Sequence, residues 1–305
     1  MSGGGTAPPP FGKRPIFVLG TARSGTSWCA NLLAMHPDIA AVATAEHEGI
    51  TGIHESHLFS HTRYCFPEEI GCRAFIDRYR EEDYFKLIGL SPRRFCERHP
   101  GRFTVFELFR ALMDDFAEAR GARCWLEKTP KHTIYYGELI ERFPDARFIV
   151  TRRGFRDTLL SNVNKYPRKG ASFPRQVIEK VFRYVSDRRA IDRLKRRCPE
   201  RIIEVAYEAL LDDTQAEIRR LLRFLRLEER ALQSKYPSNS AYGPDRRAKR
   251  PIPPLGWIGV HVARAAFWLI PFPLICYLRK RRDRQAARRF PKYTFVPAPK
   301  EWLEA

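Results

Sequence analysis

The feature that most constrains this chain is a short apolar stretch followed at once by a glycine-spaced loop and an apolar helix. Residues Ile16–Leu19 predict a buried strand, Gly20 and Gly25 bracket the loop, and Thr26–Met35 predict a helix. Glycine supplies the backbone freedom that such a turn needs. Because backbone N–H groups and the positive helix end point into such a loop, the segment predicts a phosphate-binding cradle.

The same loop lacks a residue that nucleoside triphosphate sites use. A Walker A loop carries a lysine directly after its second glycine. Here Gly25 is followed by Thr26 and Ser27, and Arg23 is the only cation inside the loop. We therefore expect a phosphate site that is not built for Mg²⁺-ATP.

A second group of polar residues follows another predicted strand. The apolar run Arg147–Thr151 predicts a buried strand that delivers Arg153 at its C-terminal end, and Ser161 lies in the helix predicted over Phe155–Asn164. Ligands bind at the C-terminal ends of parallel strands, and an arginine beside a hydroxyl suits a phosphate monoester. The strand carries no carboxylate that could hold Mg²⁺, so no metal is predicted.

Strands and helices alternate along most of the chain, which predicts an α/β fold. We expect a P-loop-like domain of three layers, in which helices flank a central, mostly parallel sheet. Residues 51–100 are mixed and aromatic and predict helices that wall an acceptor pocket. The remaining predicted strands are Ile39–Thr44, Cys124–Leu126 and Arg201–Ala206, and the remaining predicted helices are Phe103–Arg120, His132–Phe143, Pro174–Arg197 and Thr214–Leu227.

Composition divides the chain into three parts. Residues 1–12 are rich in glycine and proline and predict a disordered leader, residues 13–235 form the predicted catalytic domain, and 236–305 form a basic and apolar extension. Within the extension, residues 237–254 predict a linker.

The extension contains the most apolar segment of the chain, Leu255–Leu278, which ends in the basic run Arg279–Arg284. Its length allows a membrane span, but Pro271 and Arg264 interrupt it. An interfacial or re-entrant helix held by Trp257, Trp268 and acidic lipids is a second interpretation. A helix packed on the domain core is a third.

The formal net charge of +20 favours anionic partners such as nucleotide phosphates, nucleic acid or acidic lipids; a solvated basic surface without a partner is the alternative. The seven cysteines include no C-x-x-C pair, and no signal peptide precedes the domain. These features favour a reducing cytoplasm, with peripheral or anchored attachment at the membrane.

Four segments, in order over about residues 14–227, resemble the sulfotransferases that use 3′-phosphoadenosine 5′-phosphosulfate (PAPS). The resemblance is to the bacterial type, with motifs similar to those of tyrosylprotein and carbohydrate sulfotransferases. Gly154-Phe155 stands where that family usually has Asp-Pro, so the turn there is expected to differ. The four segments are the loop Gly20–Ser27; Leu126–His132 with Phe143–Phe148; Arg153-x7-Ser161; and Val205–Leu210 with Phe224–Leu227.

The resemblance implies a role for particular residues. The loop is expected to bind the 5′-phosphosulfate through Arg23, Ser24, Gly25, Thr26 and Ser27. The 3′-phosphate is expected to be bound by Arg153 and Ser161. Lys128 is expected near the sulfonate or the acceptor. For the general base, the resemblance favours a carboxylate after the first helix: Glu46 is the first choice, His47 and Glu48 are alternatives, and His54, His57 and His61 follow.

The expected reaction is metal-independent, in-line transfer of a sulfuryl group from PAPS to the hydroxyl of an alcohol, sugar or lipid-linked acceptor. Expected partners are thus a small-molecule, glycolipid or carbohydrate acceptor and a membrane surface contacted through residues 255–289. Nucleic acid is not expected. The alternatives are a P-loop kinase-like phosphotransferase and a non-catalytic basic protein that binds membrane or nucleic acid.

Overall fold

A five-stranded parallel sheet forms the centre of the computed structural model, which describes residues 12–47, 50–79, 83–165, 170, 172–234 and 251–289. In spatial order the strands are β2 (Ile39–Ala41), β7 (Cys124–Lys128), β1 (Arg14–Gly20), β8 (Arg147–Arg152) and β9 (Ile202–Ala206). The chain passes from β7 on one side of β1 to β8 on the other. The C-terminal end of β1 is therefore the point at which open α/β sheets bind ligands.

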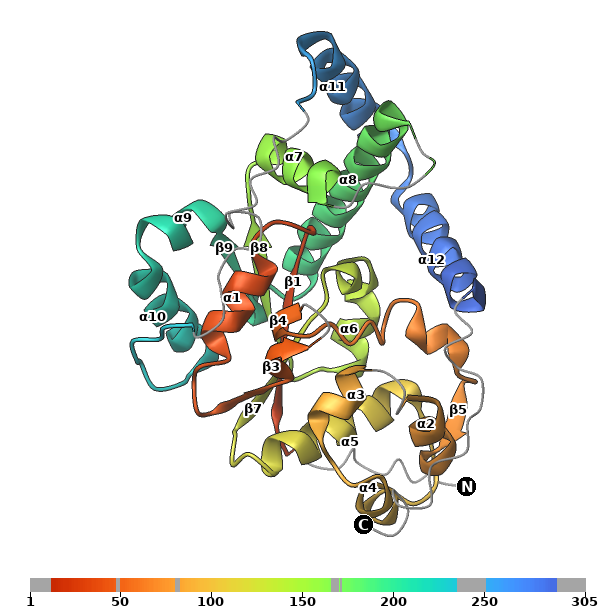
Figure 1. Ribbon diagram of the computed structural model, residues 1–305, viewed down its shortest axis with the longest axis vertical. Coiled ribbons are helices and arrows are strands. Elements are labelled where there is room, and N and C mark those ends of the chain that lie inside the picture. The colour runs from red at the N-terminus through yellow and green to blue at the C-terminus, as the bar shows by residue number, and fades with distance from the viewer. Residues whose placement is uncertain are drawn as a thin grey trace, which may run out of the picture.

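Helices cover both faces of this sheet (Figure 1). Ile16 and Val18 of β1 are buried with α1 (Thr26–Leu33) and α10 (Thr214–Leu225). Phe17 and Leu19 point to the other face because successive side chains of a strand alternate. That face packs against α5 (Val105–Glu118), α6 (Tyr136–Arg142) and α8 (Phe173–Arg197). The predicted three-layer α/β fold is confirmed.

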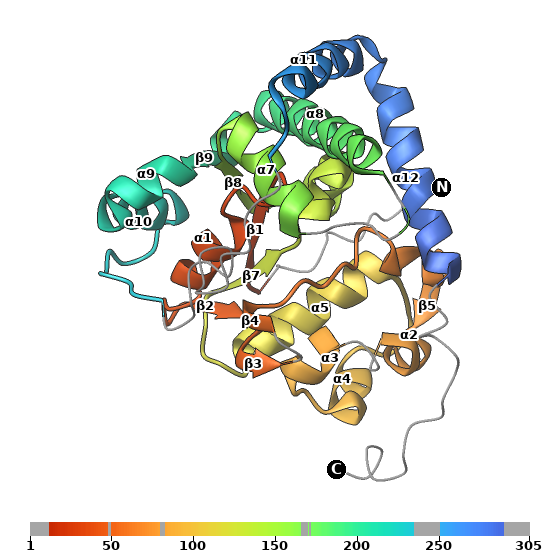
Figure 2. The same cartoon turned by 45° about the horizontal axis from the view of Figure 1, so that its top comes forward.

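The remaining elements surround this core (Figures 1 and 2). Helices α2 to α4 lie beside α5, and α7 lies beside α8. The other described elements are the strands β3 (Ala43–His47), β4 (Ile50–Ile53), β5 (Glu69–Gly71) and β6 (Arg102–Thr104); the α-helices α2 (Cys72–Tyr79), α3 (Asp83–Ile88), α4 (Pro92–Arg98), α7 (Phe155–Lys165), α9 (Tyr207–Asp212), α11 (Pro254–Leu269) and α12 (Phe272–Arg289); and the 3₁₀ helices η1 (Thr62–Cys65), η2 (Pro130–Tyr135) and η3 (Pro199–Arg201).

Two predicted elements are divided in the structure. The strand predicted over 39–44 becomes β2, which pairs with β7, and the start of β3, which pairs antiparallel with β4 outside the central sheet. The helix predicted over 132–143 was wrong at its start. There the chain forms η2, in which the Thr133 hydroxyl contacts both backbone polar groups of Gly20, and α6 follows.

The apolar segment 255–278 is also divided. Ile270 has an extended backbone, with ψ of 130°, because the following Pro271 excludes the helical conformation there. No single helix in the described part of the chain is long and apolar enough to cross a bilayer; α11 and α12 reach that length only as a pair, bent by 105°. The predicted leader and linker lie outside the described residues, apart from Gly12 and residues 251–254.

Candidate active site

The loop after β1 is shaped by two glycines with positive φ. Gly20 has φ of 151° and Gly25 of 99°. A Cβ atom on Gly20 would lie 2.6 Å from Thr151 Oγ1, and one on Gly25 would lie 2.8 Å from the Tyr207 ring. Gly25 is also the N-cap of α1 and provides no side-chain cap. The first N–H groups of α1 and its positive end are therefore available to an anion.

Neighbouring elements hold this loop by hydrogen bonds. Thr133 Oγ1 accepts from the Gly20 N–H at 3.0 Å, and Asn162 Nδ2 of α7 donates to the Ala22 carbonyl at 2.7 Å. The hydroxyls of Ser24 and Thr151 lie 2.7 Å apart. These contacts from η2, α7 and β8 fix the loop backbone.

The structure brings the two predicted phosphate motifs together. Arg23 has φ of 73°, and its Nε donates to Ser161 Oγ on α7 at 3.1 Å. The Arg153 guanidinium lies over the Tyr207 ring, 4.3 Å from its centroid, and Trp28 contacts the same ring. Residues from the loop after β1, from the turn after β8 and from α1, α7 and α9 thus meet at the C-terminal edge of the sheet.

The turn that follows Arg153 is supported from another element. The Gly154 N–H donates to Glu208 Oε1 at 3.1 Å, and α7 begins at the next residue. In the sequence, Tyr207 and Glu208 stand out only as part of the Val205–Leu210 segment that resembles a family motif. The structure places both beside Arg153, where the tyrosine contacts its guanidinium and the glutamate contacts the turn.

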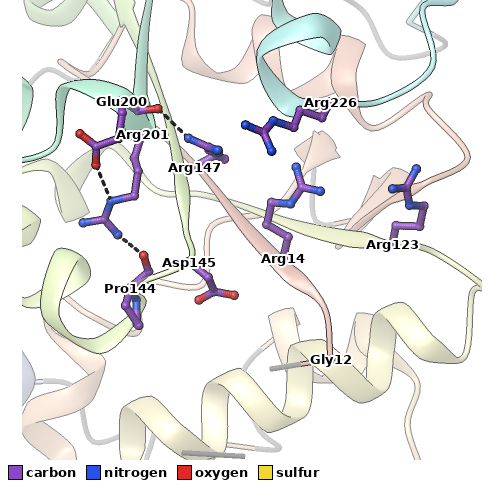
Figure 3. Close-up of a pocket in the computed structure, with 9 residues that line it drawn as sticks. All are labelled: Gly12, Arg14, Arg123, Pro144, Asp145, Arg147, Glu200, Arg201 and Arg226. Atoms are coloured by element: carbon purple, nitrogen blue, oxygen red, sulfur yellow. Dashed lines mark hydrogen bonds and ion pairs between the residues drawn. The ribbon is translucent and has the colours of Figure 1, made fainter. Parts of the chain in front are cut away.

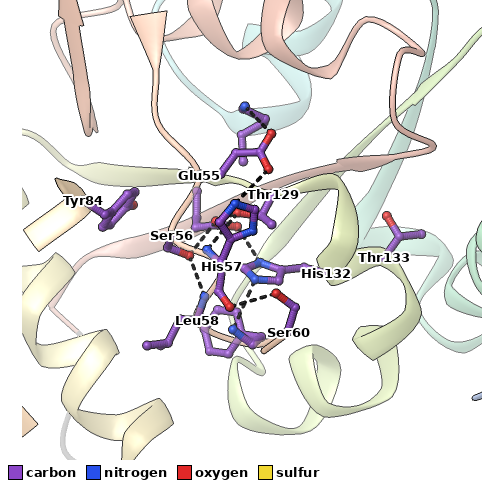
Figure 4. Close-up of polar contacts among 12 residues, drawn as sticks. Glu55, Ser56, His57, Leu58, Ser60, Tyr84, Thr129, His132 and Thr133 are labelled. Atoms are coloured by element: carbon purple, nitrogen blue, oxygen red, sulfur yellow. Dashed lines mark hydrogen bonds and ion pairs between the residues drawn. The ribbon is translucent and has the colours of Figure 1, made fainter. Parts of the chain in front are cut away.

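A second polar cluster lies at the end of β7 (Figure 4). Lys128 is 3% exposed, and its Nζ donates to Glu55 Oε1 at 3.0 Å. The other carboxylate oxygen of Glu55 lies 3.6 Å from His57 Nε2. Burial raises the pKa of Glu55, but Lys128 and His57 outweigh it and lower this pKa to about 2.

His57 differs from the other residues of this cluster in its pKa, its backbone conformation and the burial of its ring nitrogen. Burial, together with nearby Lys131 and His61, lowers its pKa to about 3 despite the opposing effect of Glu55. Its φ is 51°, a left-handed conformation that is uncommon for a residue other than glycine. Within the described residues, its Nδ1 atom is buried without a hydrogen-bond partner.

Glu127 of β7 holds the segment that contains Ser56 and His57 against the central sheet. It is fully buried and accepts from Ser56 Oγ at 2.8 Å and Thr129 Oγ1 at 2.5 Å. His132 Nε2 accepts from the Phe59 N–H, so its Nδ1 carries the proton and donates to Glu127 at 3.0 Å. Burial raises the pKa of Glu127, but these contacts outweigh it and keep the pKa below its usual range.

The residues favoured as the base are placed only in part. Glu46 and His47 end β3, but their side chains lie outside the description, as does the whole of Glu48. Of the three histidines named as alternatives, His57 contacts Glu55, which is also the partner of Lys128. Sequence reasoning missed Glu55 and Glu127, although the resemblance of the Leu126–His132 segment to a family motif was a signal for Glu127.

An arginine-lined cavity of about 580 Å³ lies elsewhere (Figure 3). Arg14 and Arg147 begin β1 and β8, so this cavity is at the opposite end of the sheet from the loop. Burial, Arg226 and Arg14 lower the pKa of Arg147 there.

Within the described residues, no group of three or more His, Cys, Asp and Glu side chains is arranged to hold a metal.

Comparisons with known proteins name one family. The model of the Sulfotransferase family matches residues 15–231. No curated protein matches the chain. The fold is similar to a sulfotransferase from Alicyclobacillus acidocaldarius (18% identity, TM-score 0.47, covering 91% of this chain and 99% of that one). It is also similar to the sulfotransferase domain of the Synechococcus PCC 7002 olefin synthase (16% identity, TM-score 0.48, covering 95% and 98%).

Proposed function

We propose that this chain, which belongs to the sulfotransferase family, transfers a sulfuryl group from PAPS to the hydroxyl of an acceptor. Membership of the family supports sulfuryl transfer in general. PAPS as the donor is supported by one observation above all, the hydrogen bond between Arg23 of the first motif and Ser161 of the second. Two cationic motifs that meet in this way suit a donor with phosphate groups at both its 5′ and 3′ positions.

The residues present fit such a donor. The 5′-phosphosulfate would lie against the loop and the first turn of α1, where Gly25 leaves the N–H groups of the helix without a side-chain cap. Arg23 would contact the phosphate that departs from sulfur. The 3′-phosphate would be bound by Arg153 and Ser161, with Tyr207 between Arg153 and Gly25.

In the transfer step, a bond forms between the acceptor oxygen and sulfur, and the bond between sulfur and the 5′-phosphate oxygen breaks. The acceptor proton passes to a base, and the negative charge that develops on the phosphate faces Arg23 and the loop amides. Lys128, held by Glu55 at the end of β7, would stabilise the charge on the transferring group.

Two candidate bases follow from these residues. Glu46 is the sequence prediction, with His47 and Glu48 as its neighbours. His57 is favoured because it contacts the same carboxylate, Glu55, as Lys128 does. Its lowered pKa leaves it neutral at pH 7 and able to accept a proton. An anionic donor bound nearby would raise that pKa and make His57 a stronger base.

The donor is tested by calorimetry with the product 3′-phosphoadenosine 5′-phosphate (PAP). Arg23→Ala and Arg153→Ala should each weaken PAP binding by about tenfold or more, because each removes a charge-assisted hydrogen bond. Arg219→Ala, an exposed arginine of α10, is the control and should bind normally. Unchanged affinity in both site variants would exclude PAPS as the donor.

The reaction is tested by incubating the protein with labelled PAPS and a cell extract, and by finding the sulfated molecule by mass spectrometry. Glu46→Gln and His57→Asn are compared in kcat, and the base is the residue whose loss lowers kcat by at least about 100-fold while PAP affinity is kept. Mg²⁺-dependent phosphoryl transfer from ATP would contradict the proposal, as would PAP binding without any sulfated product.

A further inference from the structure

Helix α11 exposes an unusual number of large apolar side chains. Leu255 is 81% exposed, Ile258 62%, Val262 65% and Leu269 85%. These residues lie at i, i+3, i+7 and i+14 and therefore share one side of the helix. The only ionisable residues of α11 are His261 and Arg264. A helix that is apolar on all sides is normally buried, and an exposed apolar patch of this kind marks an interaction surface.

The opposite side of α11 is already packed against the domain. Val260 is buried with residues of α7 and α8, and Phe267 contacts Phe182 of α8 edge to face at 5.2 Å. Arg189 of α8 donates to the Phe267 and Ile270 carbonyls at the end of α11. The helix is thus fixed, and the exposed residues face away from the domain.

Helix α12 also has an exposed side, which is apolar at its start and basic further along. Leu274, Tyr277 and Leu278 are 47%, 55% and 40% exposed. Arg281 and Arg288 follow at i+7 and i+14 from Leu274 and are exposed on the same side. We call these five residues, together with Leu255, Ile258, Val262 and Leu269, the outer face.

The charge around the outer face indicates what it contacts. Residues 251–289 contain eight lysine or arginine residues and a single acidic residue, Asp283. Arg279, Lys280 and Arg282 pair with carboxylates of the domain, whereas Arg281 and Arg288 are exposed on the outer face. Asp283 lies on the inner side, where it accepts a hydrogen bond from the Tyr135 hydroxyl at 2.7 Å. An apolar surface with a basic margin matches the interior and headgroups of an anionic bilayer. The same charge opposes the pairing of two outer faces, because like charges would then meet.

We propose that the outer face of α11 and α12 docks on the surface of an anionic lipid bilayer. The pair lies in the interface with its apolar residues among the upper acyl chains, and Arg281 and Arg288 contact lipid phosphates. Neither helix alone is long and apolar enough to span a bilayer, and the pair is bent by 105°. Placement in the interface therefore suits the two helices better than a straight span does. The proposal is independent of the donor and the acceptor assigned above.

The test is flotation of the full chain with vesicles of phosphatidylcholine, with and without phosphatidylglycerol. We expect binding to the anionic vesicles that weakens as salt is raised. Ile258→Ser/Val262→Ser/Leu269→Ser should abolish binding. Arg281→Gln/Arg288→Gln should weaken it about 30-fold on anionic vesicles, since each basic residue near the headgroups contributes separately.

Two exposed residues on the other side of the molecule provide matched controls. Leu211→Ser on α9 and Arg219→Gln on α10 should bind vesicles like the unaltered chain. Circular dichroism melting establishes that each variant is folded. Absence of vesicle binding by the unaltered chain overturns the proposal, and so does equal binding by the triple variant. A dimer in solution that the triple variant dissociates, without vesicle binding, assigns the outer face to a second copy instead and also overturns it.

Discussion

At the residue scale, the shape of the site depends on Gly25, which has no Cβ atom. Gly25 lets the Tyr207 ring approach the loop to a distance at which any Cβ would collide. The Arg153 guanidinium in turn lies over the face of this ring. A single glycine therefore links the shape of the first phosphate motif to the position of the second.

We predict that Gly25→Ala weakens PAP binding at least tenfold and lowers the melting temperature. The cost has two parts, a positive φ that alanine disfavours by about 1 kcal/mol and a contact of 2.8 Å with Tyr207. Gly121→Ala is the matched control, because Gly121 also has positive φ, 64°, but its Cβ would meet nothing within 4 Å. Equal loss of PAP affinity in both variants would refute the role given to the Tyr207 contact.

His57 should make the stability of the protein depend on pH. Its pKa is lowered from 6.5 to about 3 in the folded state, by burial first and then by Lys131, His61 and His132. The unfolded chain therefore binds a proton at a higher pH than the folded chain does. This contribution to stability is complete above about pH 6.5 and is lost progressively as the pH falls towards 3.

We predict that the free energy of unfolding, measured with urea, is lower at pH 5 than at pH 7. His57→Gln should reduce the difference, whereas Glu55 adds its own loss only at a lower pH, between 4.5 and about 2. His61, whose pKa is lowered to about 4, keeps part of the slope in the variant. An unaltered slope in His57→Gln would show that the imidazole is solvated.

At the scale of elements, the sequence predicts the strands well because each inner strand is a short apolar run that is buried on both faces. The meeting of Arg23 and Ser161 also follows, since their motifs lie after the neighbouring strands β1 and β8. The position of the second polar cluster cannot be predicted from the sequence in this way. Residues 54–58 have no periodic pattern. Their position depends on hydrogen bonds from Ser56 to Glu127, a residue buried in a strand, and from the His57 N–H to Thr129.

The docking of α12 gives an element-scale prediction. Arg279 of α12 pairs with Asp187 of α8 at 3.0 Å, and both side chains are at most 10% exposed. Asp187→Leu leaves Arg279 buried without its carboxylate and should cost about 3–5 kcal/mol. The double variant Asp187→Leu/Arg279→Met should recover most of that loss. Urea unfolding measures both, and trypsin cleavage within α12 reports its release; a double variant as unstable as the single one contradicts this pairing.

At the scale of the whole molecule, helix α12 connects the outer face with the second polar cluster: its outer side carries the face, and its inner side packs on the cluster's neighbours. Helix α12 contacts Tyr135, which belongs to the same 3₁₀ helix as Lys131 and His132. Burial lowers the pKa of Lys131, and Asp283 of α12 partly offsets that effect. Helix α12 would therefore lie between a membrane bound at the outer face and the second polar cluster.

If both proposals hold, we expect the acceptor to be an amphiphile held in that membrane. We predict that labelled PAPS and a membrane extract give a sulfated product that partitions into organic solvent. The Ile258→Ser/Val262→Ser/Leu269→Ser variant should lose this product when the acceptor is in vesicles and regain it when the acceptor is dispersed in detergent. Sulfated products found only in the aqueous fraction would exclude a membrane-borne acceptor.

The hydrogen bond between Arg23 and Ser161 has a consequence for selectivity. A ligand with one phosphate would break this bond and satisfy only one of its two partners. A ligand that carries phosphate at both ends of the right span compensates both, Arg23 at the loop and Ser161 on α7. The pair would thus distinguish ligands by the distance between their phosphate groups. Sulfate or adenosine 5′-phosphate alone would compete poorly with such a ligand, even at high concentration.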